Sequence, residues 1–322
     1  MDKFIERIAA NHNSLAIRRL MKKGDALFDF FYDKLLSEKT KKKSEQVIVT
    51  IAIVSFIIHL LLIAAVDLGF LQPTDRSKLL SNPIVAIYTP FSFILIYEVY
   101  LLVYYLPKST SNYIGKQYEI ITLIVIRRIY SELSKLEFTA DWFKVTNDLQ
   151  FTYDLVATTA LFFLIFIFYR LNEKVIEKPK DSLPSLEVKN YTRTKKIIAM
   201  CLVPLFLVLA VYSFGHWVYE NFFSITRMVD SIKDVNKIFF DEFFTVLILT
   251  DVLMLLISFL LTDKFNRVIR NSGFVISTIL IKLSFGASGL LNSVLVVVAV
   301  LFGVTMLAIY NQYEKLNPET DV

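Results

Sequence analysis

Long, uninterrupted apolar runs constrain this chain more than any other feature of its sequence. Six runs exceed 18 residues and carry few charges: 47–71, 84–106, 151–171, 197–219, 240–262 and 289–312. A run of this length can cross the hydrocarbon core of a membrane as a helix. Hydrophobic residues make up 55% of the chain and charged residues 20%. This composition excludes a soluble globular enzyme, a disordered chain and a disulfide-rich secreted domain.

Two shorter apolar runs, 117–134 and 271–287, each contain a basic residue, and they are either spanning or re-entrant. The distribution of Lys and Arg discriminates between these cases, because cytoplasmic loops are enriched in both residues. Six spans would place 21 basic residues in inner segments and 14 in outer ones, whereas eight spans would place 25 inside and seven outside. We therefore expect eight spans with both ends of the chain in the cytoplasm.

An internal repeat also favours eight helices. Residues 94–106 resemble 246–260, residues 120–127 resemble 275–282, and residues 168–174 resemble 309–315, at offsets of 153, 155 and 141. Four helices in each half give the two halves the same orientation, as parallel repeats about an axis along the membrane normal.

The predicted fold is therefore an all-α, multi-pass protein of the cell membrane (plasma or inner membrane), with about eight transmembrane helices in two tandem, parallel four-helix repeats. Its predicted segments are cytoplasmic amphipathic and basic helices at 1–45, a first repeat at 46–174, a cytoplasmic linker at 175–194, a second repeat at 195–315 and a tail at 316–322. Membrane lipid is the first expected partner, and a homo-oligomer is compatible with the sequence.

Charged residues inside the apolar runs are the main candidates for a functional role, because a charge at the bilayer centre needs a partner or water. Glu98 and Arg127 are predicted at matching depth on consecutive helices, and so are Asp251 and Lys282 in the second half. The pairs either line a hydrated polar pathway or simply neutralise each other and fix the helix register.

Other polar residues have two interpretations each. Asp67, Asp154, Asp241 and Glu242 fall near predicted outer helix ends, where they form either an acidic mouth that attracts cations or an ordinary solvated rim. His59, in the middle of the first run, is either a pH modulator or a neutral imidazole bonded to a carbonyl or hydroxyl group.

Several chemistries lack their residues. The single cysteine, Cys201, is expected to be buried, and with only three histidines the sequence predicts no metal site and no cofactor. Nucleotide-binding and hydrolase motifs are absent, so we do not expect an enzyme. The basic residues flank apolar runs, which argues against a nucleic-acid partner.

These observations predict an ion channel or an ion-coupled transporter that moves small cations or protons along a path lined by the charge pairs. The alternative is a non-transporting scaffold or receptor-like subunit whose basic N-terminal helices dock a cytosolic partner.

Overall fold

The computed structural model describes residues 28–70, 83–133, 146–176, 186–222, 235–261 and 265–316. The chain divides into two compact units, residues 1–47 and 48–322. In the first unit, residues 28–35 are helical and a bend follows. The hydroxyl group of Ser37 accepts a hydrogen bond of 3.2 Å from the backbone N–H of Thr40, as an N-cap residue does. The predicted N-terminal helices are thus described only in part, because residues 1–27 lie outside the described residues.

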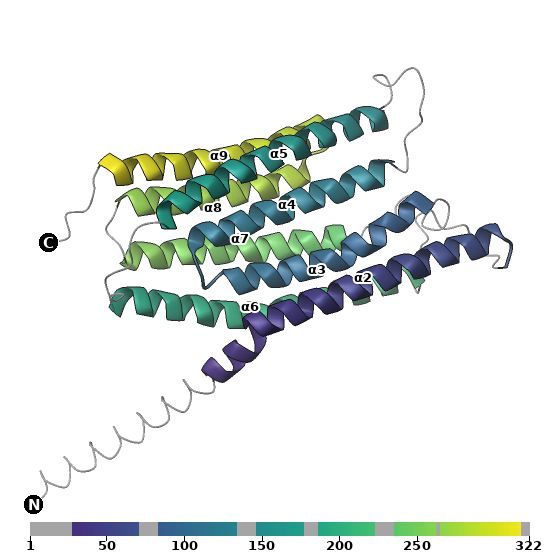
Figure 1. Ribbon diagram of the computed structural model, residues 1–322, viewed down its shortest axis with the longest axis horizontal. Coiled ribbons are helices and arrows are strands. Elements are labelled where there is room, and N and C mark those ends of the chain that lie inside the picture. Colours follow the sequence, from purple (N-terminus) through teal and green to yellow (C-terminus); the bar gives the residue numbers. More distant parts are fainter. Residues whose placement is uncertain are drawn as a thin grey trace, which may run out of the picture. The chain divides into compact units, whose positions relative to one another are not determined.

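All the described secondary structure is helical, and each of the eight apolar segments falls largely on a helical stretch. The elements are α2 (Glu38–Asp67), η2 (Pro83–Ile87), α3 (Tyr88–Tyr105), α4 (Thr110–Leu133), α5 (Thr146–Ile176), α6 (Leu186–Phe222), α7 (Val235–Leu261), α8 (Phe265–Gly286) and α9 (Leu290–Leu316). Consecutive helices run in opposite directions (Figure 1).

Several helices begin earlier than their apolar runs indicate. The helices α4 and α8 begin at Thr110 and Phe265, and α6 begins at Leu186, inside the predicted linker. Polar residues continue each of these helices beyond its apolar part. The turn between α8 and α9 is short, and Gly289 adopts a φ of 62° there, a conformation that glycine accommodates without strain.

The helices of the second unit pack in a closed cycle. Along it, α3 contacts α4, α4 contacts α5, α5 contacts α9, α9 contacts α8, α8 contacts α7, α7 contacts α6, and α6 contacts α3. Contacts between α4 and α8 cross the interior of this cycle. Aromatic rings pack together in this interior. The ring centre of Phe168 lies 5.2 Å from that of Tyr118 and 5.9 Å from that of Phe274. Residues from both halves of the chain therefore share one core.

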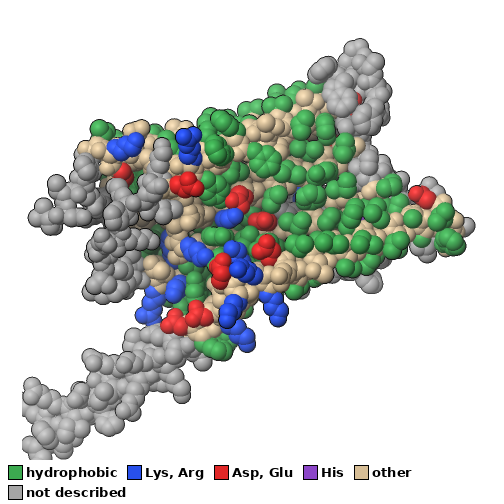
Figure 2. Space-filling model, in the orientation of Figure 1, with side chains coloured by type: hydrophobic (Ala, Val, Ile, Leu, Met, Phe, Trp, Pro, Cys, Tyr) green, Lys and Arg blue, Asp and Glu red, His purple; other side chains and the backbone are tan. Residues whose placement is uncertain are grey.

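Five helices in the described part of the chain are long and apolar enough to cross a membrane: Phe28–Asp67, Asp148–Glu173, Glu242–Leu260, Phe265–Gly286 and Leu290–Leu316. Large apolar side chains are exposed on them, including Phe162, Phe163, Leu253, Val298 and Leu301. In Figure 2, charged side chains gather toward one end of the visible face, and hydrophobic side chains cover most of the rest. An exposed apolar surface of this extent is typical of contact with lipid.

Candidate functional site

A buried carboxylate lies where α4, α7 and α8 meet. Asp251 on α7 is 5% exposed, and its Oδ2 accepts a hydrogen bond of 3.0 Å from Nε2 of Gln117 on α4. The hydroxyl group of Thr278 on α8 donates to Oε1 of Gln117, also over 3.0 Å. Among the described residues Asp251 forms no ion pair. The hydrogen-bond partner of the carboxyl group is thus a neutral amide, and a carboxylate buried without a cation in contact is costly in an apolar interior.

A second buried hydrogen-bond chain runs beside it. The hydroxyl groups of Tyr118 on α4 and Ser277 on α8 lie 2.9 Å apart, and Ser277 donates to the carbonyl oxygen of Ala299 on α9 over 2.6 Å. All three residues are buried. Both hydrogen-bond chains cross from residues before the predicted linker to residues after it, so the polar core lies at the seam between the two halves.

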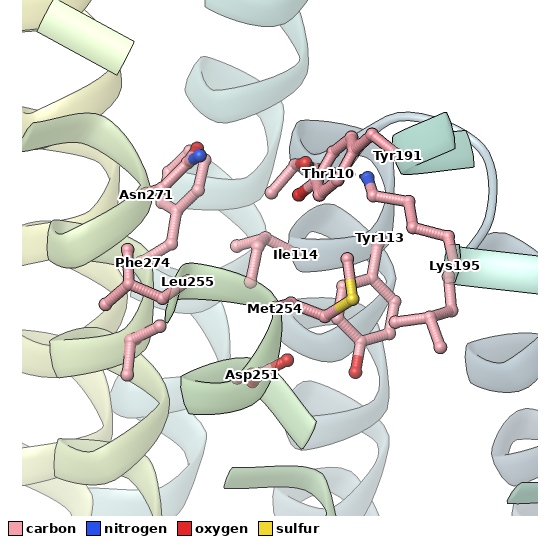
Figure 3. A pocket seen from close by; sticks show the side chains of 12 residues that line it. Thr110, Tyr113, Ile114, Tyr191, Lys195, Asp251, Met254, Leu255, Asn271 and Phe274 are labelled. Atoms are coloured by element: carbon pink, nitrogen blue, oxygen red, sulfur yellow. Dashed lines mark hydrogen bonds between the residues drawn. The ribbon is translucent and has the colours of Figure 1, made fainter. Parts of the chain in front are cut away.

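A cavity of about 30 Å³ opens beside Asp251. Figure 3 shows Lys195, Tyr191, Thr110 and Asn271 around one end of it and Asp251 at the other. The remaining lining side chains include Tyr113 and the apolar residues Ile114, Met254, Leu255 and Phe274. A water needs roughly 10–15 Å³ of such volume and two to four polar partners. The cavity therefore has room for about two waters, and its two ends supply the polar partners.

The cation at this cavity, Lys195 on α6, is also buried. It is 4% exposed, donates to the hydroxyl group of Thr110 over 3.1 Å, and lies 4.6 Å from the ring centre of Tyr191. Burial, together with the positive charge of Arg270, lowers the pKa of Lys195 to about 8. An amine with such a pKa can both lose and gain a proton near neutral pH.

Arg270 extends the polar end of the cavity along α8. Its Nη2 donates to Oδ1 of Asn271 over 3.1 Å, and its guanidinium group lies 4.4 Å from the ring centre of Tyr310 on α9. Asn271 in turn donates to the hydroxyl group of Ser258 on α7 over 3.0 Å. These contacts hold the cavity-lining side chains of α7 and α8 in place.

A different polar cluster joins α4, α5 and α9. Arg128 donates to both carboxylate oxygens of Asp154, over 2.5 Å from Nε and 2.6 Å from Nη2, and Asp154 is fully buried. Gln150 and Ser293 donate to the same carboxylate over 2.9 Å and 2.7 Å. Arg128 also donates to Asn292. Asp154, expected at an outer mouth, is thus the buried member of an ion pair with the partly exposed Arg128.

The members of each charge pair lie at different distances from the ends of their helices, whereas the sequence predicts equal depth. Glu98 lies seven residues before the end of α3, and Arg127 lies 17 residues after the start of α4. At 1.5 Å per residue, Glu98 is about 11 Å and Arg127 about 26 Å from the turn that joins these two helices. In the second half, Asp251 bonds to Gln117, whereas Lys282 donates to Thr245, six residues earlier on α7. The early starts of α4 and α8 explain both offsets.

The remaining predicted residues have separate positions. His59 on α2 shares a 2.6 Å hydrogen bond between its Nδ1 and the hydroxyl group of Thr89 on α3. Asp67 and Glu242 are exposed, and the side chain of Asp241 lies outside the described residues. Neither Asp67 nor Glu242 contacts the polar cluster of Asp154.

Sequence reasoning missed Gln117, Lys195 and Thr278. Gln117 begins the run 117–134 and Lys195 begins the second repeat, so the sequence indicates only that each lies at a segment boundary. A polar amide or amine at the start of an apolar run is the feature that could have identified them as site residues. Cys201 was expected to be buried and is exposed, because it lies on an outward-facing side of α6.

No group of three His, Cys, Asp or Glu side chains within the described segments could hold a metal ion. Comparison with known protein families, with curated proteins and with solved structures finds no match for this chain.

Proposed function

We propose that this protein moves protons or small cations across a membrane, through the seam between its two halves, with Asp251 as the group that binds the moving ion. One observation supports this most directly: Asp251 is buried, forms no ion pair among the described residues and lines a cavity. A buried ionisable residue in a membrane-spanning helix is typically functional. Space for about two waters suits a proton better than a hydrated cation.

The same proposal includes eight membrane crossings, one for each helix from α2 to α9, with both ends of the chain in the cytoplasm. Alternating helix directions are consistent with it (Figure 1). Parallel repeats are supported by one matched pair of contacts. Tyr169 on α5 packs over Gly115 on α4, and Tyr310 on α9 packs over Arg270 on α8. Tyr310 is offset from Tyr169 by 141 positions, and Arg270 is offset from Gly115 by 155, which are the offsets of the repeat.

A labelling experiment tests the number of crossings. In a Cys201→Ser background, Asp141→Cys lies between α4 and α5 and should react with an impermeant thiol reagent added outside intact cells. Labelling only after the cells are opened would contradict eight crossings and, with them, the parallel repeats.

Ion flux in proteoliposomes tests the function. Purified protein should dissipate gradients of protons, and we expect less or no movement of Na⁺ and K⁺. The variants Asp251→Asn and Glu98→Gln test the two carboxylates of the predicted path, and the exposed Glu242 on α7, as Glu242→Gln, is the matched control. Flux equal to that of empty liposomes, at every pH and voltage, would contradict the proposal.

The alternative function is a membrane scaffold. It is favoured by the exposure of Phe30 (62%) and Phe31 (44%) in the described part of the N-terminal segment, because exposed aromatic side chains are enriched at protein interfaces. A protein without flux in any condition, whose N-terminal segment binds a defined cytosolic protein and loses it in Phe30→Ser, would support the scaffold.

A further inference from the structure

Two opposite buried charges face one cavity without contacting each other. Lys195 enters it from α6 and Asp251 from α7, at opposite ends (Figure 3). The contacts of Lys195 are with neutral groups, Thr110 and Tyr191. Asp251 accepts its hydrogen bond from the neutral amide of Gln117. Neither residue forms an ion pair in the part of the chain that the structure describes.

Such an arrangement has two states of equal total charge. In one state Lys195 is an ammonium group and Asp251 a carboxylate. In the other, one proton has moved from Nζ to a carboxylate oxygen, which leaves a neutral amine and a neutral carboxylic acid. Burial penalises the two charges of the first state, whereas Coulomb attraction across the cavity favours them. Opposing contributions of this kind keep both states accessible.

Water in the cavity can connect the two groups. The volume accommodates about two waters. Thr110, Tyr191 and Asn271 line the cavity at the end where the amine of Lys195 lies, and Tyr113 also lines it. A proton can therefore pass from Nζ along bridging waters without direct contact between the two residues.

We propose that Lys195 is the proton relay that loads and unloads Asp251 through this cavity. The Nζ–H bond of Lys195 breaks, a proton moves along the bridging waters, and an O–H bond forms on Asp251. Lys195 then takes a new proton from the solvent at the basic end of the bundle. This inference rests on the proposed movement of protons through Asp251.

The surroundings of Lys195 suit a relay. The charged and titratable groups that face it are Arg270 on α8, Tyr191 on α6 itself, Tyr113 on α4 and Asp251 on α7. Arg270 disfavours the ammonium form, as burial does, and the pKa of Lys195 is about 8. The amine therefore exchanges protons in the range where a cytoplasmic relay has to work.

The decisive variant is Lys195→Arg. Arginine keeps the positive charge and the hydrogen-bond donors but does not lose its proton in proteins, so it preserves a structural role and abolishes a relay. We expect proton flux in proteoliposomes to fall about tenfold or more in both Lys195→Arg and Lys195→Gln. The neighbouring Lys196→Gln, which removes a lysine that does not line the cavity, should retain wild-type flux.

An infrared titration in detergent tests the relay even where a variant gives no usable flux in liposomes. In detergent, the infrared C=O band of the protonated Asp251 carboxyl group is identified by its loss in Asp251→Asn. Its pH midpoint should move by about one pH unit or more in Lys195→Gln, because the two groups titrate as a coupled pair. In Lys196→Gln the midpoint should stay in place.

The outcomes separate the two proposals. Wild-type flux retained in Lys195→Arg, or an unchanged midpoint in Lys195→Gln, contradicts the relay and leaves proton movement through Asp251 standing. Wild-type protein that moves no protons contradicts the proposed function and the relay together.

Discussion

The side-chain amide of Gln117 on α4 donates a 3.0 Å hydrogen bond to the carboxylate of Asp251 on α7, across 134 positions of sequence. Gln117 also accepts from Thr278 on α8, so one buried side chain connects three helices and both halves of the chain. The contact holds the carboxylate at the edge of the cavity. It therefore links the packing of the bundle to the group that we propose binds the moving ion.

Removal of this amide should destabilise the protein. In Gln117→Leu, Asp251 and Thr278 lose a buried partner, and an unsatisfied buried polar group costs about 1–3 kcal/mol. The free energy of unfolding in detergent, measured by denaturant titration, should fall by that amount. Thr305→Val, at an exposed site on α9 whose hydroxyl group bonds only within its own helix, is the control. Equal stabilities of the two variants would show that the amide contributes nothing.

The ion pair at the other end of α4 should be a larger contributor. Arg128→Met leaves the fully buried Asp154 without its cation, and loss of one member of a buried pair costs about 3–5 kcal/mol. Thermal unfolding in detergent measures the loss, with Glu173→Gln, exposed on the same helix as Asp154, as control. The double variant Arg128→Met/Asp154→Leu should recover much of it, because no isolated charge remains. A double variant as unstable as Arg128→Met would contradict this account.

A methyl group at Gly303 should be better tolerated without the hydroxyl group of Tyr118, although the ring carbon Cζ would still lie 2.9 Å from it. A Cβ atom at Gly303 on α9 would overlap that hydroxyl group, which is held by Ser277. Overpacking of this kind costs about 1–3 kcal/mol, more than the roughly 1 kcal/mol that alanine gains over glycine in a helix. Melting temperatures should fall in Gly303→Ala and rise again in Gly303→Ala/Tyr118→Phe. The absence of any such rescue would rule out this contact as the cause.

The pKa of Lys195 gives stability a defined pH dependence. It falls from 10.5 to about 8 on folding, so between these values the unfolded chain binds more protons than the folded one. Stability therefore rises with pH through this window, and the penalty for burying the charged amine is fully present below about pH 8. The melting temperature of the wild type, relative to that of Lys195→Met, should increase between about pH 7.5 and about pH 10. A constant difference would contradict the shift, and Lys196→Met serves as the matched control.

The sequence predicts the helices far better than their register. Apolar runs located every helix from α2 to α9, because burial in a core or in lipid needs the same residues. Their ends were misplaced where polar residues continue a helix, as at Thr110 and Phe265. Six or seven extra residues at the start of a helix place a given side chain about 10 Å farther from the preceding turn. The equal depth predicted for Asp251 and Lys282 therefore does not match the observed register.

The candidate site was predictable only in part. Asp251 stands out as a carboxylate in an apolar run, and Asp154 as an acid near a predicted outer helix end. Their partners, Gln117 and Arg128, depend on which helices are neighbours, and this follows from packing across the whole bundle. A single sequence contains no direct signal for such long-range contacts.

The central claim is that Asp251 binds the moving proton. Its most direct test compares initial rates of proton flux in proteoliposomes that contain equal amounts of wild-type protein, Asp251→Asn and Glu242→Gln, under the same pH gradient and membrane potential. Asp251→Asn keeps the shape and the acceptor for Gln117 but cannot take up a proton. The account predicts flux in the wild type and in Glu242→Gln, and none above empty liposomes in Asp251→Asn. Equal flux in all three proteins would contradict it.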